Sequence, residues 1–161
     1  MTKVATCLWF DRQAEEAARL YTSLVADSRI NRVNRAPSDN PSTKQGEVLT
    51  VDFTVGGHDV IGLNGGPGFP FTEAASLSVL CEDQEEVDRL WSGLILDGGE
   101  PSRCGWLKDK FGVSWQIVPK SLPEMLASDD REAAERAMNA MLGMDKLDIK
   151  ALTDAYEGIP A

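Results

Sequence analysis

Residues 49–55 are the segment best suited to chemistry, because polar and apolar side chains alternate along it. A strand places every second side chain on the same face, so Thr50, Asp52 and Thr54 would present two hydroxyl groups and a carboxylate together. Asp52 is the only obvious acid or base of the set, which makes it the candidate catalytic residue. Other expected strands add neutral groups to such a face: Asn64, Ser76, Ser78, Ser114 and Gln116.

This polar face has two interpretations. It could be an ordinary solvated side of a sheet whose apolar side packs against helices. It could also be the concave lining of a pocket that binds a small organic molecule through hydroxyl and amide groups. The sequence leaves both interpretations open. Two similar halves with similar polar residues on one face favour the pocket more than a single sheet would.

The single histidine and the three cysteines are weaker candidates for catalysis or metal binding. The only histidine, His58, follows a Gly-Gly turn, so we expect a solvent-facing hairpin residue in preference to a metal ligand or general base. Of the three cysteines, Cys7 is expected to face the helices. Cys104 has lysines nearby that could favour a thiolate, but a small, buried, inert cysteine is the preferred interpretation.

The strands and helices that would position these residues occur twice, as an internal repeat of the sequence. Residues 15–24 (EEAARLYTSL) and 85–94 (EEVDRLWSGL) match at an offset of 70, and both have the apolar spacing of a helix. Asp11 and Asp83 are the expected N-caps. Each helix follows an apolar run expected to be a strand. The remaining expected strands are 29–34, 49–55 and 58–64 in the first half, and 100–104, 106–108 and 113–118 in the second.

The chain is therefore expected to have an α+β fold of two βαβββ repeats, at about 3–64 and 75–119, within a domain over residues 1–120. Beyond Pro119 the pattern changes to three helices, at 121–128, 129–142 and 146–156, which we expect to form a helical extension over 121–161. The middle helix carries an apolar stripe that could seal the domain's own core or contact a second copy.

Composition excludes several classes. The 161 residues have a net charge of −10, which disfavours binding to nucleic acid or to anionic membranes. No apolar run approaches the roughly 20 residues of a membrane span, and the start of the chain lacks a signal-peptide layout. An odd number of cysteines without a CxxC pair favours a reducing, cytoplasmic location.

Three segments carry a family resemblance: 63–67 (LNGGP), 71–74 (FTEA) and 104–119 (CGWLKDKFGVSWQIVP). With these, the chain resembles the PhnB-like branch of the vicinal-oxygen-chelate superfamily, which includes glyoxalase I, bleomycin-resistance proteins and extradiol dioxygenases. The branch is often labelled 3-demethylubiquinone-9 3-methyltransferase. The resemblance is expected to extend over the C-terminal helices and implies a homodimer.

The resemblance also implies where a metal would be held. By position, the superfamily's ligand sites fall on Thr6, Ser76, Gln116 and a residue near Gly62 or Asn64, and none of these is a good ligand for a transition metal. We therefore expect no metal. The expected substrate-binding residues are Thr6, Asp52, Asn64, Ser76, Trp106 and Gln116.

The reaction stays open. The protein could be an enzyme that polarises a substrate oxygen with neutral donors, a non-catalytic protein that binds or sequesters a small molecule, or an unconventional methyltransferase. The Gly-rich stretch 64–68 runs into prolines and not into a helix, so no conventional S-adenosylmethionine site is readable. We expect no cofactor.

Overall fold

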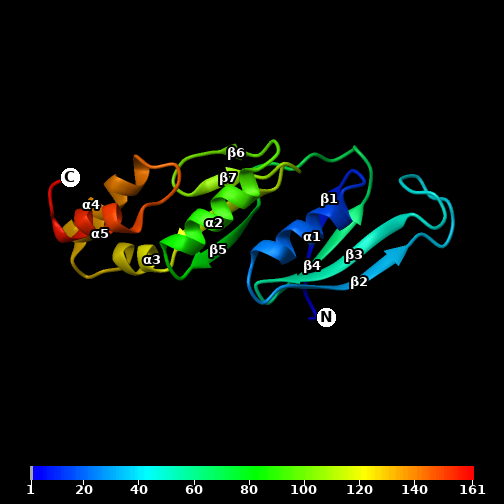
Figure 1. The fold of residues 1–161 in the computed structure, drawn as a ribbon, viewed down its shortest axis with the longest axis horizontal. Helices are drawn as coiled ribbons and strands as arrows, with labels where there is room; N and C mark the ends of the chain where they lie inside the picture. The colour runs from blue at the N-terminus through cyan, green and yellow to red at the C-terminus, as the bar shows by residue number, and fades with distance from the viewer. Residues whose placement is uncertain (1) are drawn as a thin grey trace. The chain divides into compact units, whose positions relative to one another are not determined.

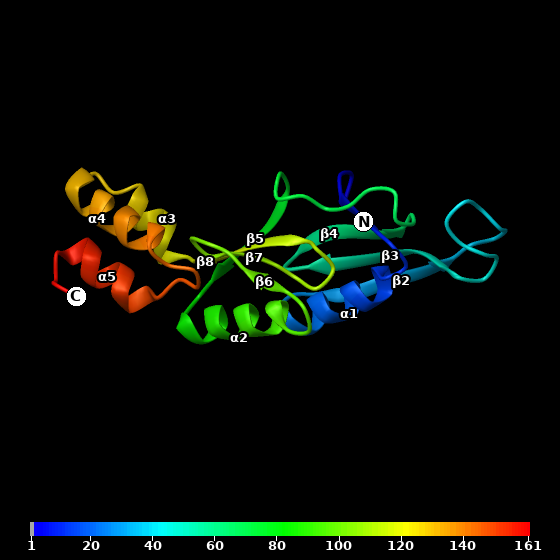
Figure 2. The ribbon, with the colours of Figure 1, turned by 90° about the horizontal axis from the view of Figure 1, so that it is seen from above.

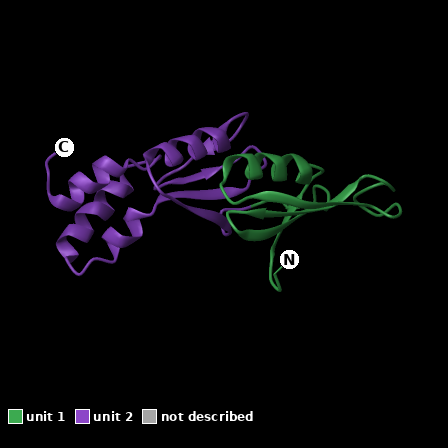
Figure 3. Cartoon of the chain, turned by 60° about the horizontal axis from the view of Figure 1, so that its bottom comes forward, with its two compact units in different colours: residues 1–71 green, residues 72–161 purple. Residues whose placement is uncertain are grey.

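The computed structural model describes residues 2–161, and the chain forms two compact units, residues 1–71 and 72–161 (Figure 3). Each unit contains one strand–helix–three-strand repeat, and three further helices follow the second repeat. The predicted α+β fold with two βαβββ repeats and C-terminal helices is confirmed. The expected division into residues 1–120 and 121–161 stays a prediction.

Unit 1 is a four-stranded sheet with one helix. The strand order is β1-β4-β3-β2, with β1 parallel to β4 and the other pairs antiparallel. The Gly-Gly turn gives the tight β3–β4 hairpin that the sequence predicts. The elements are β1 (Thr6–Phe10), α1 (Ala14–Leu24), β2 (Arg29–Arg35), β3 (Val48–Val55) and β4 (His58–Asn64) (Figure 1).

One face of this sheet packs against α1. Tyr21 of α1 lies over Phe53 of β3, with ring centroids 6.2 Å apart. The helix presents alanines to β4, and a Cβ added to Gly62 would lie 3.1 Å from the Ala14 Cβ. Small residues on both sides therefore let the helix backbone approach the strand closely.

Unit 2 repeats the plan with the strand order β5-β8-β7-β6, in which β5 is parallel to β8. Asp83 caps the helix, as predicted, by accepting a hydrogen bond from the Glu86 N–H at 2.9 Å. The expected strand over 100–104 is shortened to two residues. The elements are β5 (Ser76–Cys81), α2 (Gln84–Ile95), β6 (Glu100–Pro101), β7 (Trp106–Lys108) and β8 (Ser114–Pro119).

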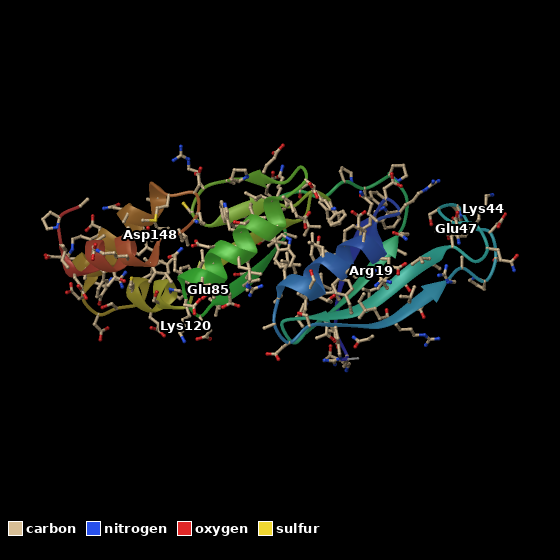
Figure 4. The ribbon with its side chains drawn as sticks, in the orientation of Figure 1. Arg19, Lys44, Glu47, Glu85, Lys120 and Asp148 are labelled. Atoms are coloured by element: carbon tan, nitrogen blue, oxygen red, sulfur yellow. The ribbon has the colours of Figure 1, made fainter. Side chains whose placement is uncertain are left out.

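The last three helices, α3 (Ser121–Leu126), α4 (Arg131–Leu142) and α5 (Ile149–Glu157), pack together beyond β8 (Figure 2). Asp148, labelled in Figure 4, caps α5 by accepting a hydrogen bond from the Ala151 N–H. The Gln84 side chain of α2 ties this group to the repeat, because its amide donates to the Leu147 carbonyl and accepts from the Ile149 N–H. Within the described residues, no helix is long and apolar enough to cross a bilayer.

Candidate functional site

Each sheet has a face opposite its own repeat helix, and we call it the helix-free face. In unit 1 this face carries Thr50, Asp52 and Thr54, as the alternation in the sequence predicts. Asn34 of β2 donates to the Thr50 hydroxyl at 3.0 Å and to the Asp52 carboxylate at 3.2 Å. Asp52 is half-buried and already engaged by a neutral donor.

A hollow of about 690 Å³ opens on this face. Inside it the Thr54 hydroxyl accepts a hydrogen bond from Asn31 and donates one to Asp59, both at 2.9 Å. The Thr2 N–H and the Thr54 hydroxyl both donate to Asp59, and these hydrogen bonds lower the pKa of its carboxyl. The polar groups of this hollow are thus bonded mainly to one another. Its lining is Thr2, Arg29, Asn31, Asp52, Thr54, Gly57 and Asp59.

Thr6 does not join this set. It pairs with Val60, whose buried side chain faces α1, and its hydroxyl lies 2.9 Å from the His58 Nε2. His58 is exposed at the start of β4, as predicted for a hairpin residue. Cys7 takes the opposite face from Thr6 and is exposed, so the expectation that Cys7 faces the helices is wrong.

A difference in loop length explains the reversal. Three residues, 11–13, separate β1 from α1, whereas only two, 82–83, separate β5 from α2. The helices match at an offset of 70, but the preceding strands match at 71. A shift of one residue moves a side chain to the other face of a strand, so Thr6 and Ser76 are not equivalent.

Asn64 has a structural role. Its side-chain oxygen accepts a hydrogen bond from the Ala14 N–H at 2.9 Å, and its amide donates to the Val48 carbonyl at 2.9 Å. Only 5% of Asn64 is exposed. It therefore caps α1 from a neighbouring strand, and the expectation that Asp11 caps this helix is wrong: the N-cap is Gln13, whose side chain makes no capping bond.

Trp9 lies on the helix-free face of unit 1, on the same side of β1 as Cys7. Its indole N–H donates to the Gly66 carbonyl at 2.8 Å, and Phe69 meets the ring edge-on at 4.9 Å. A Cβ on Gly65 would lie 2.3 Å from the ring. The Gly-Gly segment after β4 is thus held against an aromatic ring, and Gly65 is needed for that approach.

In unit 2 the structure brings three predicted residues together. Ser76, Trp106 and Gln116 share the helix-free face, because Trp106 pairs directly with Gln116 across β7 and β8. The Gln116 amide donates to the Ser76 hydroxyl at 2.9 Å. Trp106 is half-buried, and no hydrogen bond of its indole N–H is found within residues 2–161.

Next to them lies a cavity of about 310 Å³, within the range of small-molecule sites. Ser114 is 2% exposed, and its buried hydroxyl has no hydrogen-bond partner within the described chain. Lys108 forms an ion pair with Glu73, which lowers the pKa of Glu73 and raises that of Lys108. The cavity is lined by Glu73, Glu100, Pro101, Ser102, Trp106, Leu107, Lys108 and Ser114.

Asp109 supports this wall from the turn between β7 and β8. It is 2% exposed and accepts hydrogen bonds from the Phe111 N–H, the Val113 N–H and the Trp115 indole N–H, at 2.9 to 3.0 Å. This carboxylate fixes the turn between β7 and β8, and thereby the positions of Lys108 and Ser114. Asp109 stands three positions before Gly112, and this spacing in the sequence is typical of a turn in which the Asp side chain accepts backbone hydrogen bonds.

The cysteines and acids form no evident metal centre. Within residues 2–161, no three His, Cys, Asp or Glu side chains lie together in a way that could hold an ion. Cys81 is fully buried, and burial raises the pKa of its thiol to about 12. A thiol of that pKa is almost entirely protonated near neutral pH and is a poor nucleophile.

Comparison with known proteins identifies the fold and the family. A profile described as 3-demethylubiquinone-9 3-methyltransferase matches residues 2–118. The chain belongs to this PhnB-like family. A PhnB protein from Bacillus cereus, described as a candidate enzyme of that name, is 36% identical over 73% of this chain and 99% of its own, with a TM-score of 0.66. A Pseudomonas aeruginosa protein, 18% identical over 71% of this chain and 95% of its own, shares the fold at a TM-score of 0.58. No curated protein matches the chain.

The family match ends at residue 118, just before α3. The profile therefore does not reach the C-terminal helices, and the expectation that the resemblance extends over them stays a prediction. The matched residues contain both repeats. The helices at 121–157 have an apolar core of their own, formed by Leu122, Leu147 and Leu152.

Proposed function

We propose that the helix-free face of the second sheet binds a small organic molecule without a metal ion. One observation carries the proposal: the half-buried Trp106 ring and polar residues of β6, β7 and β8 line a cavity of about 310 Å³ in unit 2. A cavity of that volume with an aromatic wall and a few polar groups is typical of a site for a small organic molecule.

The predicted site is thereby narrowed. Ser76, Trp106 and Gln116 remain in it, and Ser114 joins them. Thr6 and Asn64 are used inside unit 1, by His58 and by the start of α1. Asp52 belongs to the hollow of unit 1 and stays the candidate acid or base of that hollow.

The donor set argues against a metal. Metal-binding members of the wider vicinal-oxygen-chelate superfamily use His and Glu, whereas Ser76, Trp106 and Gln116 offer only neutral side chains. The cavity lining also contains two carboxylates, but Glu73 is paired with Lys108, and within residues 2–161 no third His, Cys, Asp or Glu side chain joins them to hold an ion. Metal analysis of the purified protein tests this, and a stoichiometric transition metal would contradict it.

The family's name invites the hypothesis of methyl transfer from S-adenosylmethionine, but the residues do not fit that group. A conventional site places a Gly-rich turn between a parallel strand and a helix, whose N–H groups receive the cofactor. Here the segment after β4, residues 65–75, is irregular, and the next regular element is the strand β5. We therefore derive no step through this cofactor.

Two functions fit a metal-free pocket. An enzyme would use neutral donors to polarise a substrate oxygen, and a sequestering protein would only bind. The candidate acid or base, Asp52, lies in unit 1 and accepts a hydrogen bond from Asn34, whereas the cavity lies in unit 2. This separation favours a protein that binds its ligand without a reaction. A homodimer in a cytoplasmic setting, as the resemblance implies, remains part of the proposal.

Nuclear magnetic resonance provides the test. A library of neutral and charged aromatic fragments is titrated into the full chain, and the Trp106 indole resonance is followed. Binding fragments should shift it. Trp106→Leu should weaken their binding, which is followed in that variant by the side-chain amide resonance of Gln116, the cross-strand partner of residue 106. Asp52→Asn is the matched control on the other helix-free face, and it should leave binding unchanged. Fragments that shift only unit 1 resonances, or none that shift Trp106, would contradict the proposal.

A further inference from the structure

The cavity of unit 2 already holds a bound carboxylate, and the chain itself supplies it. Lys108 is the only basic residue among the lining residues of this cavity, and its ammonium group forms an ion pair with Glu73. Lys108 lies on β7, with Glu100 of β6 on one side and Ser114 of β8 on the other. The wall of the cavity therefore has one defined place that receives a carboxylate.

The carboxylate at this place can be displaced. Glu73 belongs to residues 72–75, four exposed residues that precede β5 and that we call the strap. The other lining residues lie on β6, β7 and β8 or next to β6, whereas the pairing of β5 with β8 begins only at Ser76. The side chain of Glu73 is 61% exposed and that of Lys108 is 38% exposed. Since exposed ion pairs of this kind contribute little free energy, Glu73 can leave Lys108 at low cost.

The neighbour of Lys108 on the same face is aromatic. Trp106 precedes Lys108 by two residues on β7, which places their Cα atoms about 7 Å apart on one side of the strand. A small molecule with a carboxylate at one end and an apolar body at the other could contact both side chains. If its carboxylate replaces that of Glu73, the ion pair at Lys108 is kept. A ligand with an ammonium group would instead meet the charge of Lys108 itself.

We propose that Glu73 is a built-in competitor at this site, and that the ligand is a small organic acid that displaces Glu73 from Lys108. The apolar body of the acid packs on Trp106, and the Glu73 side chain turns into solvent with the strap. This inference rests on the proposed function and names the class of ligand for the same site.

Three compounds of similar size provide the test: phenylacetate as the anion, phenylacetamide as the neutral probe and phenethylamine as the cation. Each is titrated into the full chain near neutral pH at constant ionic strength, while the Trp106 indole resonance and the backbone resonances of Glu73 and Ala74 are followed. Phenylacetate should bind most tightly and phenethylamine least. Phenylacetate should also shift Glu73 and Ala74, because it releases the strap, whereas phenylacetamide should shift Trp106 without them.

Substitutions then separate competition from simple charge. Glu73→Gln should tighten phenylacetate about threefold, because Lys108 is no longer occupied, and should leave phenylacetamide unchanged. Lys108→Met should reduce the affinity for phenylacetate to that for phenylacetamide. Glu100→Gln removes the same charge from the same wall, but within residues 2–161 no ion pair of Glu100 is found. It should therefore tighten phenylacetate less than Glu73→Gln does.

Glu82→Gln is the matched control outside the cavity, since it breaks an exposed ion pair with Lys120 in the same unit. It should change none of the three affinities. Equal gains in Glu73→Gln and Glu100→Gln, or no gain in Glu73→Gln, would overturn the inference. The proposed function would stand as long as fragments still shift Trp106. If none of the three probes and no library fragment shifts Trp106, both are overturned.

Discussion

The two helix-free faces have the same topology but different hydrogen bonding. In unit 1, Asn31, Thr54 and Asp59 form a continuous chain of hydrogen bonds, and Asn34 joins Thr50 to Asp52. In unit 2, Ser76 is joined to Gln116 and Lys108 to Glu73, and the buried Ser114 hydroxyl has no hydrogen-bond partner within residues 2–161.

Their tryptophans differ in the same way. Trp9 donates to the Gly66 carbonyl and packs against Phe69, so its ring is fixed by the chain itself. Trp106 pairs with Gln116 across the sheet and lines the cavity. The first face therefore uses its polar and aromatic groups for its own structure, and we propose that the second uses them to bind a ligand.

The largest effect should come from breaking the anchored tryptophan. Gly65→Ala places a Cβ within 2.3 Å of the Trp9 ring, which must then move and lose its hydrogen bond to Gly66. The overlap should lower the free energy of unfolding by about 3 kcal/mol. Urea unfolding followed by circular dichroism measures it.

Gly68→Ala is the control, because nothing lies within 4 Å of a Cβ at that position. In a Trp9→Leu background, Gly65→Ala should cost much less. Equal costs in the two backgrounds would show that the ring is not what excludes a side chain at residue 65.

A smaller loss should follow from removing the cap that β4 provides to α1. Asn64→Ala leaves the Ala14 N–H and the Val48 carbonyl without their partner. The expected loss is about 2 kcal/mol in the free energy of unfolding. Asn139→Ala, on the exposed side of α4, should cost little.

The same variant tests the sequence prediction that Asn64 contacts substrate. Fragments that bind at Trp106 should bind Asn64→Ala with unchanged affinity at a temperature where the variant is folded. A selective loss of affinity, with stability preserved, would restore Asn64 to the binding site.

The sequence predicts most of the strands and helices because their periodicity is local. The alternation over 49–55 places Asp52 and Thr54 on the correct face, and the apolar spacing of 85–94 gives the buried side of α2. Ser76, Trp106 and Gln116 lie on one face, because alternation fixes the side of the strand that each side chain takes, whereas the pairing between strands sets their register.

The features that could not be predicted from the sequence depend on the length of the loops between elements and on bonds between distant residues. One extra residue between β1 and α1 reverses the faces of Thr6, Cys7 and Trp9, although the helix match at an offset of 70 stays intact. The side chains of Asn64 and Asp109 accept hydrogen bonds from backbone N–H groups, of Ala14 and Val113 respectively. These bonds form only once the strands are paired, so the sequence pattern does not reveal them. An orphan hydroxyl such as Ser114 cannot be read from a pattern at all.

The smallest expected effect compares two hydroxyls directly. Thr54→Val removes a buried hydroxyl that has two partners, Asn31 and Asp59, and should cost about 1.5 kcal/mol in the free energy of unfolding. Ser114→Ala removes a buried hydroxyl that has none, so its cost should be below about 0.5 kcal/mol, and a slight gain is expected because an unpaired polar group leaves the interior. Urea unfolding of the two variants, measured in parallel, gives the difference between the two costs. If both hydroxyls prove equally costly to remove, Ser114 is as fully bonded as Thr54, and the distinction between a structural face and a binding face is lost.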